Sequence, residues 1–207
     1  MNLPQPDEPR RDPAPDGYAV VAIASSAGGL QALNKVIGRL PAGFPVPVLV
    51  VQHLDPRHET VIADILARRT ELGVKLAQHG EHARPGVVYV APPDRHLLVE
   101  ADGHLALTDS ELVHFVRPSA DLMFESVAGS YGARAIACVL TGTGSDGAMG
   151  VSAVKARGGT VLVEDPGTAE FNGMPEAAVA TGAVDFVLGL DEIAPVIIGL
   201  VNAGRSR

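Results

Sequence analysis

Short apolar runs alternate along this chain with longer segments in which apolar residues recur every three or four positions. Residues 18–24, 46–52 and 135–140 form three such runs, and a helical pattern follows each after a few small or polar residues. Continuous apolar runs are typical of strands buried on both faces of a parallel sheet, and apolar residues at spacings of three and four indicate helices. The pattern therefore predicts repeated strand–turn–helix units.

The middle of the chain has a different pattern. Residues 96–100 and 104–108 are apolar-rich and flank Asp102-Gly103, a dipeptide that favours a tight hairpin turn. Further strand-like and helical segments follow up to residue 203. We predict an α/β protein with a doubly wound, mostly parallel sheet, helices on both faces and an antiparallel hairpin at the edge, which makes three layers, α/β/α.

Composition suggests one folded unit in the 207 residues. Residues 1–17 contain five prolines and almost no apolar side chains, so we expect a disordered leader. Residues 18–203 are expected to form a single folded domain and residues 204–207 a short tail. No internal repeat is visible.

Charge and cysteine content exclude several classes of protein. The chain has 16 Lys and Arg against 24 Asp and Glu, a net charge of −8, which argues against a nucleic-acid partner. Cys138 is the single cysteine, so neither an intramolecular disulfide nor a cysteine-based zinc site is possible. The apolar runs are too short to span a bilayer, and no signal peptide is visible. We expect a cytoplasmic protein without membrane insertion.

Polar residues stand directly after the three buried runs. Ser26 follows the first, His53 the second, and Asp146 closes the loop after the third. Ligands of open parallel sheets bind at the carboxyl ends of the strands, where these three residues would supply a nucleophile, a base and an orienting acid. Taken singly, each has an ordinary alternative: a helix cap for Ser26, a loop histidine for His53 and a turn residue for Asp146.

The glycines after Ser26 support the same interpretation. Ser26-Ala27-Gly28-Gly29 is a sharp turn of small residues that could present backbone N–H groups to an oxyanion. It differs from the G-x-S-x-G elbow, because Ala24 stands where the first glycine would be. No metal site is expected, since the closely spaced histidine pairs lack further ligands nearby.

Two other classes of function remain open. The segment 142–147 matches G-x-G-x-x-G, and Glu164 follows the next strand, as in a dinucleotide-binding oxidoreductase. The carboxylate of Asp146 would oppose a pyrophosphate there, and this interpretation leaves Ser26 and His53 unexplained. The third class is a catalytically silent adaptor, an interaction module in which the pocket is vestigial.

Taken in order, the motifs resemble the catalytic domain of the CheB family of chemotaxis protein-glutamate methylesterases. The resemblance runs from about residue 20 to 187 and rests on Ile23-Ala-Ser-Ser26-Ala-Gly-Gly29, Gln52-His53, Gly86-x-x-Tyr89-x-Ala-Pro92, Arg117-Pro-Ser119-x-Asp121-x-x-Phe124, Leu140-Thr-Gly-x-Gly-x-Asp146-Gly147 and Gly173-Met-Pro175.

The resemblance implies a cofactor-free serine hydrolase that removes methyl esters from glutamate side chains on the cytoplasmic helices of chemoreceptors, and in many members also deamidates glutamine. It implies a triad of Ser26, His53 and Asp146, with an oxyanion donor at the backbone of Thr143 beside that of Ala27. A protein substrate suggests an open groove, for which the candidates are Gly28, Gly29, Arg57, Arg117, Gly144 and Met174. For the two arginines, a surface or structural salt bridge is an equal alternative.

Some positions depart from the family pattern. Ala24, Ser25 and Ala27 replace the usual Gly, Ala and Thr around the nucleophile, and Thr143 replaces a common Met. Typical members also carry a phosphorylatable receiver domain, and residues 1–17 are too few to form one. The regulatory receiver domain is therefore expected to be absent from this chain.

Overall fold

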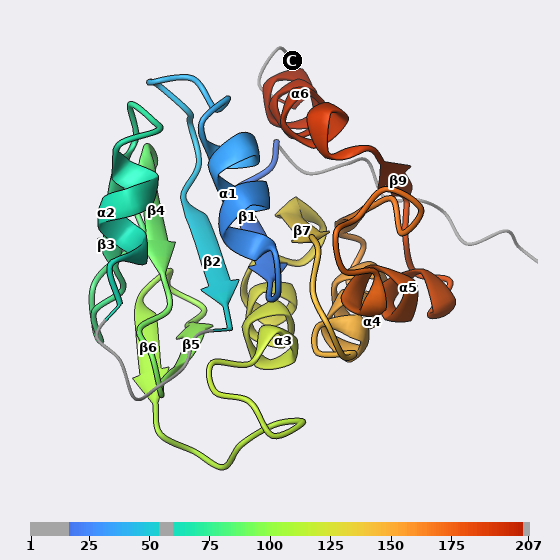
Figure 1. Ribbon diagram of the computed structural model, residues 1–207. Coiled ribbons are helices and arrows are strands. Elements are labelled where there is room, and N and C mark those ends of the chain that lie inside the picture. The colour runs from blue at the N-terminus through green and yellow to red at the C-terminus, as the bar shows by residue number, and fades with distance from the viewer. Residues whose placement is uncertain (1–16, 54–59, 205–207) are drawn as a thin grey trace, which may run out of the picture.

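A computed structural model describes residues 17–53 and 60–204 (Figure 1). Regular elements follow one another closely along the chain. In order they are β1 (Val20–Ser25), α1 (Gly29–Ile37), β2 (Val48–Gln52), α2 (Ile62–Ala67), β3 (Gly73–Leu76), β4 (Val87–Val90), β5 (His96–Val99), β6 (Leu105–Thr108), α3 (Ala120–Tyr131), a 3₁₀ turn (Gly132–Arg134), β7 (Ala135–Val139), α4 (Ala148–Ala156), β8 (Thr160–Glu164), α5 (Gly173–Ala180), β9 (Phe186–Leu188) and α6 (Leu190–Ala203).

Seven of these strands form one parallel sheet in the order β3-β4-β2-β1-β7-β8-β9. The chain leaves β1 toward β2 and β4, and later returns to the other side of β1 with β7. The strand order therefore reverses between β1 and β7, and such a switch point is where open α/β sheets bind their ligands.

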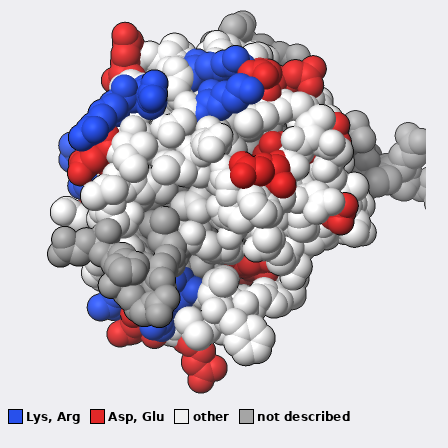
Figure 2. Space-filling view, in the orientation of Figure 1, with Lys and Arg blue, Asp and Glu red and all other residues white. Residues whose placement is uncertain are grey.

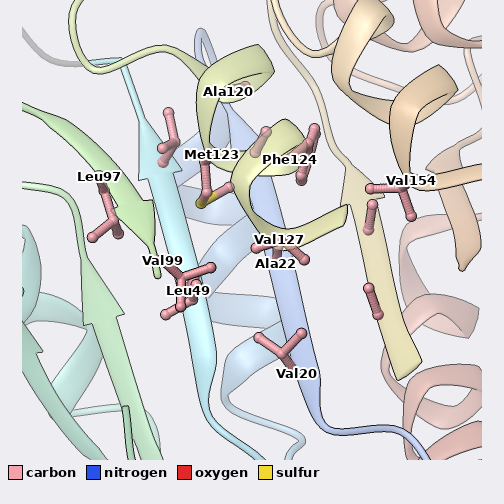
Figure 3. Packing of buried hydrophobic residues seen from close by; sticks show 14 of the residues in the cluster. Val20, Ala22, Leu49, Leu97, Val99, Ala120, Met123, Phe124, Val127 and Val154 are labelled. Carbon is pink, nitrogen blue, oxygen red and sulfur yellow. The ribbon is translucent and has the colours of Figure 1, made fainter. Parts of the chain in front are cut away.

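Helices cover both faces of the sheet, as predicted. The alternation of side chains along β1 divides the core: Val21 and Ile23 pack with α1, α2 and α6, whereas Val20, Ala22 and Ala24 pack with α3, α4 and α5. Figure 3 shows the second layer, with side chains of α3 lying over β1 and β2. All six residues of β1 are buried, which explains why its sequence is a continuous apolar run.

The predicted antiparallel hairpin is present and forms a sheet of its own. β5 and β6 pair only with each other, and they are joined through the turn at Asp102 and Gly103. The hairpin is fixed to α3 by hydrogen bonds of Val99 with the hydroxyls of Ser126 and Ser130. It thereby supports the helix whose first residues reach the candidate site.

The ends of the chain lie largely outside the described residues. This applies to residues 1–16 of the predicted leader and to residues 205–207 of the predicted tail. Within the described ranges, no helix is long and apolar enough to cross a membrane.

Candidate active site

The loops after β1, β2 and β7 begin side by side. The β1–β2 register places Ser25 opposite Gln52. The N–H of His53 donates to the Ser25 carbonyl at 3.1 Å, and the N–H of Ser26 donates to the Thr141 carbonyl at 3.0 Å. Parallel pairing thus brings the residues that follow three strands to one edge of the sheet.

His53 and Asp146 form a hydrogen-bonded pair at this edge. The Nε2 atom of His53 lies 2.8 Å from Oδ2 of Asp146. The imidazole side chain is 13% exposed and the carboxylate 4% exposed. An aspartate buried this deeply needs partners for its charge, and it is the imidazole that connects it to the open side of the site.

The remaining partners of Asp146 come from the first turn of α3. Its carboxylate accepts hydrogen bonds from the Ser119 hydroxyl at 2.8 Å and from the N–H groups of Ala120 and Asp121 at 2.6 and 3.1 Å. Burial raises the pKa of the carboxyl, but the hydrogen bonds from His53 and the two amides outweigh it, so the pKa of Asp146 lies below its usual value. Asp146 is therefore an anion held by α3.

Gln52 fixes the backbone next to the candidate nucleophile. Its Nε2 donates to the carbonyls of Ser26 and His53 at 2.8 and 3.0 Å, and its Oε1 accepts the Ser25 hydroxyl at 2.7 Å. Gly29 packs so closely on this pair that a Cβ there would lie 2.1 Å from Gln52 Oε1. The amide side chain thus locks the serine turn to the histidine.

Ser26 itself follows β1 in a half-buried position. Among the described residues, its hydroxyl has no hydrogen-bond partner, so the contact between serine and histidine is not made in this state. Catalytic hydrogen bonds are often long before substrate binds and tighten in the complex.

The loop after β7 is held by Thr141. Its N–H donates to Glu164 Oε2 at 2.7 Å, and its hydroxyl contacts the carbonyls of Ala27 and Phe171 at 3.1 and 3.2 Å. Glu164 is 2% exposed. This carboxylate supports the loop from inside and is not placed to bind a ribose, which counts against the dinucleotide alternative.

The two candidate oxyanion donors flank Ser26. Ala27 is half-buried in the turn after Ser26, and Thr143 is exposed in the loop after β7. Neither backbone N–H donates to any residue of the described chain. Gly28 and Gly144 next to them adopt positive φ angles of 73° and 84°, which glycine tolerates without strain.

The candidate groove residues lie in different environments. Gly144 is exposed, Gly28 half-buried and Gly29 buried. Met174 is 1% exposed, and a Cβ on Gly142 would lie 2.3 Å from its sulfur, so Met174 packs beneath the loop rather than lining a surface.

Of the two candidate arginines, the structure describes Arg117. Arg117 bonds Asp94 and the carbonyls of Asp109 and Ser110, which matches the structural salt bridge given as its alternative. Arg57 lies outside the described residues.

The sequence analysis gives no role to Gln52 or Ser119, although both lie in the motifs that carry the family resemblance. A sequence signal exists for both: Gln52 is a polar residue that ends a buried strand, and Ser119 opens a predicted helix. Ser119 caps α3 and also binds Asp146. The second contact crosses 27 residues of sequence, so local pattern alone could not reveal it.

The three candidate residues do not line the nearby pocket, which is open to solvent. A cavity of about 490 Å³ is lined by residues of α1, α6 and the loops between, including Gly28, Lys35 and Glu164, but not by Ser26, His53 or Asp146. No cluster of three or more potential metal ligands occurs among the residues with described positions.

A buried aspartate paired with a histidine, near a serine at the switch point of a parallel sheet, is a set of residues that serine hydrolases use. Comparison with known proteins identifies the family: residues 21–197 match the CheB methylesterase family, and the chain belongs to it.

Similar proteins cover this chain over most of its length. A protein of Leptospira interrogans is 39% identical over 183 residues, which is 88% of this chain and 95% of that protein. Protein-glutamate methylesterase/protein-glutamine glutaminase 3 of Anaeromyxobacter dehalogenans is 43% identical over 90% of this chain, but the match is 57% of its own length. The crystal structure of the Thermotoga maritima CheB methylesterase catalytic domain matches with a TM-score of 0.85 at 40% identity, covering 89% of this chain and 99% of that one.

Proposed function

We propose that this chain is a protein-glutamate methylesterase that hydrolyses the methyl esters of glutamate side chains on the cytoplasmic helices of chemoreceptors. The observation that carries the proposal is the buried His53–Asp146 pair at the strand edge next to Ser26. Family membership supports the same chemistry, and relatives bear the name protein-glutamate methylesterase. A substrate on the cytoplasmic helices of receptors implies a cytoplasmic location for the proposed activity.

The reaction begins with proton transfer from Ser26 to His53. Because Nε2 of His53 is hydrogen-bonded to Asp146, Nδ1 is the nitrogen that accepts this proton. The Ser26 oxygen attacks the ester carbonyl, and the tetrahedral intermediate collapses as the imidazolium returns the proton to the departing methoxide. Methanol leaves, and water activated by His53 then hydrolyses the acyl-enzyme to free glutamate and Ser26.

Asp146 supports both proton transfers without being protonated itself. The depressed pKa keeps this carboxylate ionised throughout the neutral range, so it holds the tautomer with the proton on Nε2 and stabilises the imidazolium. The α3 donors fix the carboxylate, and through it the ring, in one orientation.

The N–H groups of Ala27 and Thr143 are the proposed oxyanion donors. Both are free to bind a ligand oxygen, because neither donates to a described residue. Each is expected to contribute roughly 3 kcal/mol to transition-state stabilisation, as for donors deleted in other hydrolases.

A substrate carried on another protein's helix fits the open position of this site. Gly28, Thr143 and Gly144 are the proposed contacts of the substrate backbone, because these small residues leave room around the nucleophile. Figure 2 shows acidic side chains both near the middle and along the margins of the face in view, with Lys and Arg mainly along its upper and left margins. Because the net charge is −8, recognition of an acidic helix is expected to depend on local contacts rather than on net attraction.

Deamidation of receptor glutamines is the second activity we propose, because relatives carry both activities in their names. It needs the same acyl-enzyme, with ammonia leaving instead of methanol.

Methanol release from a methylated receptor signalling fragment tests the proposal. Wild-type protein should release methanol, and ammonia from the glutamine form, whereas Ser26→Ala should be inactive. Equal rates for both proteins would overturn the serine mechanism. A wild type that binds the fragment without releasing methanol would favour the silent adaptor.

A further inference from the structure

A tight turn beside α3 has an unusual backbone. Val113 and Val116 pair through two hydrogen bonds, and the two residues between them, His114 and Phe115, have φ angles of 49° and 64°. A turn with two positive φ angles normally uses Asn and Gly. Bulky residues strain the backbone there, and such strain is retained where it serves a function.

Packing of Phe115 does not offset this cost, because its side chain is 94% exposed. The contact that the turn provides is made by His114. Its Nε2 lies 3.3 Å from Oδ2 of Asp121, a residue of the first turn of α3. The imidazole is 45% exposed, whereas the carboxylate is 3% exposed, so the turn brings a solvent-accessible base to a buried acid.

Asp121 connects this contact to the active site. Its Oδ1 accepts the N–H groups of Gly147 and Gly150 at 2.9 and 2.7 Å, at the start of α4. Gly147 directly follows Asp146, and the N–H of Asp121 itself donates to Asp146. Asp121 therefore holds the Asp146 loop from two sides.

The other oxygen of Asp121 lacks such support. Oδ2 is buried and accepts no hydrogen bond from the described residues. Burial raises the pKa of Asp121 and the nearby charge of Asp146 adds to the rise, while the Gly150 and Gly147 amides and the His114 ring oppose it.

Among the described ionisable groups around Asp121, His114 is the one source of positive charge that is not bound elsewhere. The Asp146 carboxylate repels the Asp121 carboxylate, and His53 is already bound to Asp146. His96 is bound to the Ser119 N–H and the Glu111 carbonyl. His114 is the imidazole that faces Asp121 directly.

We propose that His114 is a positioning residue for the esterase site: its ring, when protonated, supplies the counter-charge that keeps Asp121 ionised and bound to the α4 amides. An ionised carboxylate accepts amide hydrogen bonds more strongly than a neutral one, so His114 holds Gly147, and with it Asp146, against His53. The activity part of this inference rests on the proposed function.

His114→Gln removes the charge and keeps a polar side chain in the turn. We expect its kcat/KM to fall at the acidic end of the pH range, with the acidic limb displaced upward by roughly one pH unit and the activity at high pH retained. His104→Gln is the matched control, because His104 and Asp102 form a similar pair at 3.0 Å in the hairpin turn. It should leave the pH profile unchanged.

Repeating the His114 substitution in an Asp121→Asn variant tests whether Asp121 is the group on which His114 acts. Asp121→Asn keeps the shape of the side chain and removes its charge, so adding His114→Gln to it should produce no further displacement. Unchanged profiles for His114→Gln, or an equal displacement in both backgrounds, would overturn the proposal.

A measurement independent of activity separates this inference from the proposed function. Carbon-13 NMR of the Asp121 carboxyl should show its titration moving to higher pH in His114→Gln but not in His104→Gln. No movement would refute the pairing even if methanol release is observed, and movement would support it even if no ester is hydrolysed.

Discussion

The Ser119 hydroxyl links the beginning of α3 to the acid of the site. It donates to the buried Asp146 carboxylate at 2.8 Å and accepts a longer bond from the Leu122 N–H at 3.4 Å. A hydrogen bond to a charged group contributes about 1.5–3 kcal/mol, and a helix cap with this geometry about 0.5–1 kcal/mol. Ser119→Ala should therefore lower the free energy of unfolding by about 2–4 kcal/mol.

Activity should fall in the same variant. Asp146 keeps its bonds to His53 and to two amides, so the carboxylate remains in place but is less firmly oriented. We expect kcat/KM for methanol release to fall about tenfold, equivalent to about 1.4 kcal/mol of transition-state stabilisation. Urea unfolding monitored by circular dichroism and an ester hydrolysis assay measure the two effects.

Ser126→Ala is the control, because Ser126 lies on the same helix and its hydroxyl likewise makes two hydrogen bonds. It accepts from the Val99 N–H and donates to the Met123 carbonyl. Those bonds are neutral and remote from Asp146, so this variant should lose about 1–2 kcal/mol of stability and keep its activity. Equal activities of the two variants would refute the role given to Ser119.

Three further predictions concern the support of the site. Gln52→Leu leaves two carbonyls and the buried Ser25 hydroxyl without their hydrogen-bond partner. The free energy of unfolding, measured by denaturation, should therefore fall by about 2–4 kcal/mol, and kcat should fall as well. An unchanged kcat would contradict the proposal that Gln52 fixes the serine turn. Gly29→Ala places a Cβ 2.1 Å from a Gln52 oxygen and should abolish activity. Gly199→Ala is the control, because Gly199 is exposed on α6 with free space around it. Its free energy of unfolding, measured by thermal unfolding, should rise by about 0.5–1 kcal/mol. Burial raises the pKa of Glu164, so the contribution of this residue to wild-type stability falls as pH rises from the ordinary carboxyl pKa through the raised one. Glu164→Gln escapes this loss, and its stability relative to wild type should increase with pH in urea unfolding; a difference that does not vary with pH would be the contrary result.

The sheet and the common edge at which the three candidate residues lie were predictable, because both depend on short-range pattern and on one topological rule. A continuous apolar run such as β1 indicates a buried parallel strand, and all parallel strands of a sheet end at the same edge. Ser26, His53 and Asp146 could therefore be placed together without knowledge of any side-chain contact.

The supporting contacts were not predictable in the same way. Ser119 to Asp146 and Ser25 to Gln52 each cross 27 residues of sequence, and no local periodicity records such a contact. Met174 shows the same limit, because its burial depends on the absence of a side chain at Gly142, on a different element. The hairpin was predicted from its turn, but its separation from the main sheet depends on packing against α3.

The most direct test of the account is to identify the acyl-enzyme. Wild-type protein mixed with a methylated receptor fragment and quenched in acid within one turnover should carry the glutamyl adduct on Ser26, located by mass spectrometry of its peptide. Ser25→Ala should retain the adduct at Ser26, since Ser25 is buried against Gln52, and Ser26→Ala should show none. Methanol release by Ser26→Ala at the wild-type rate, or an adduct on Ser25, would contradict the central claim.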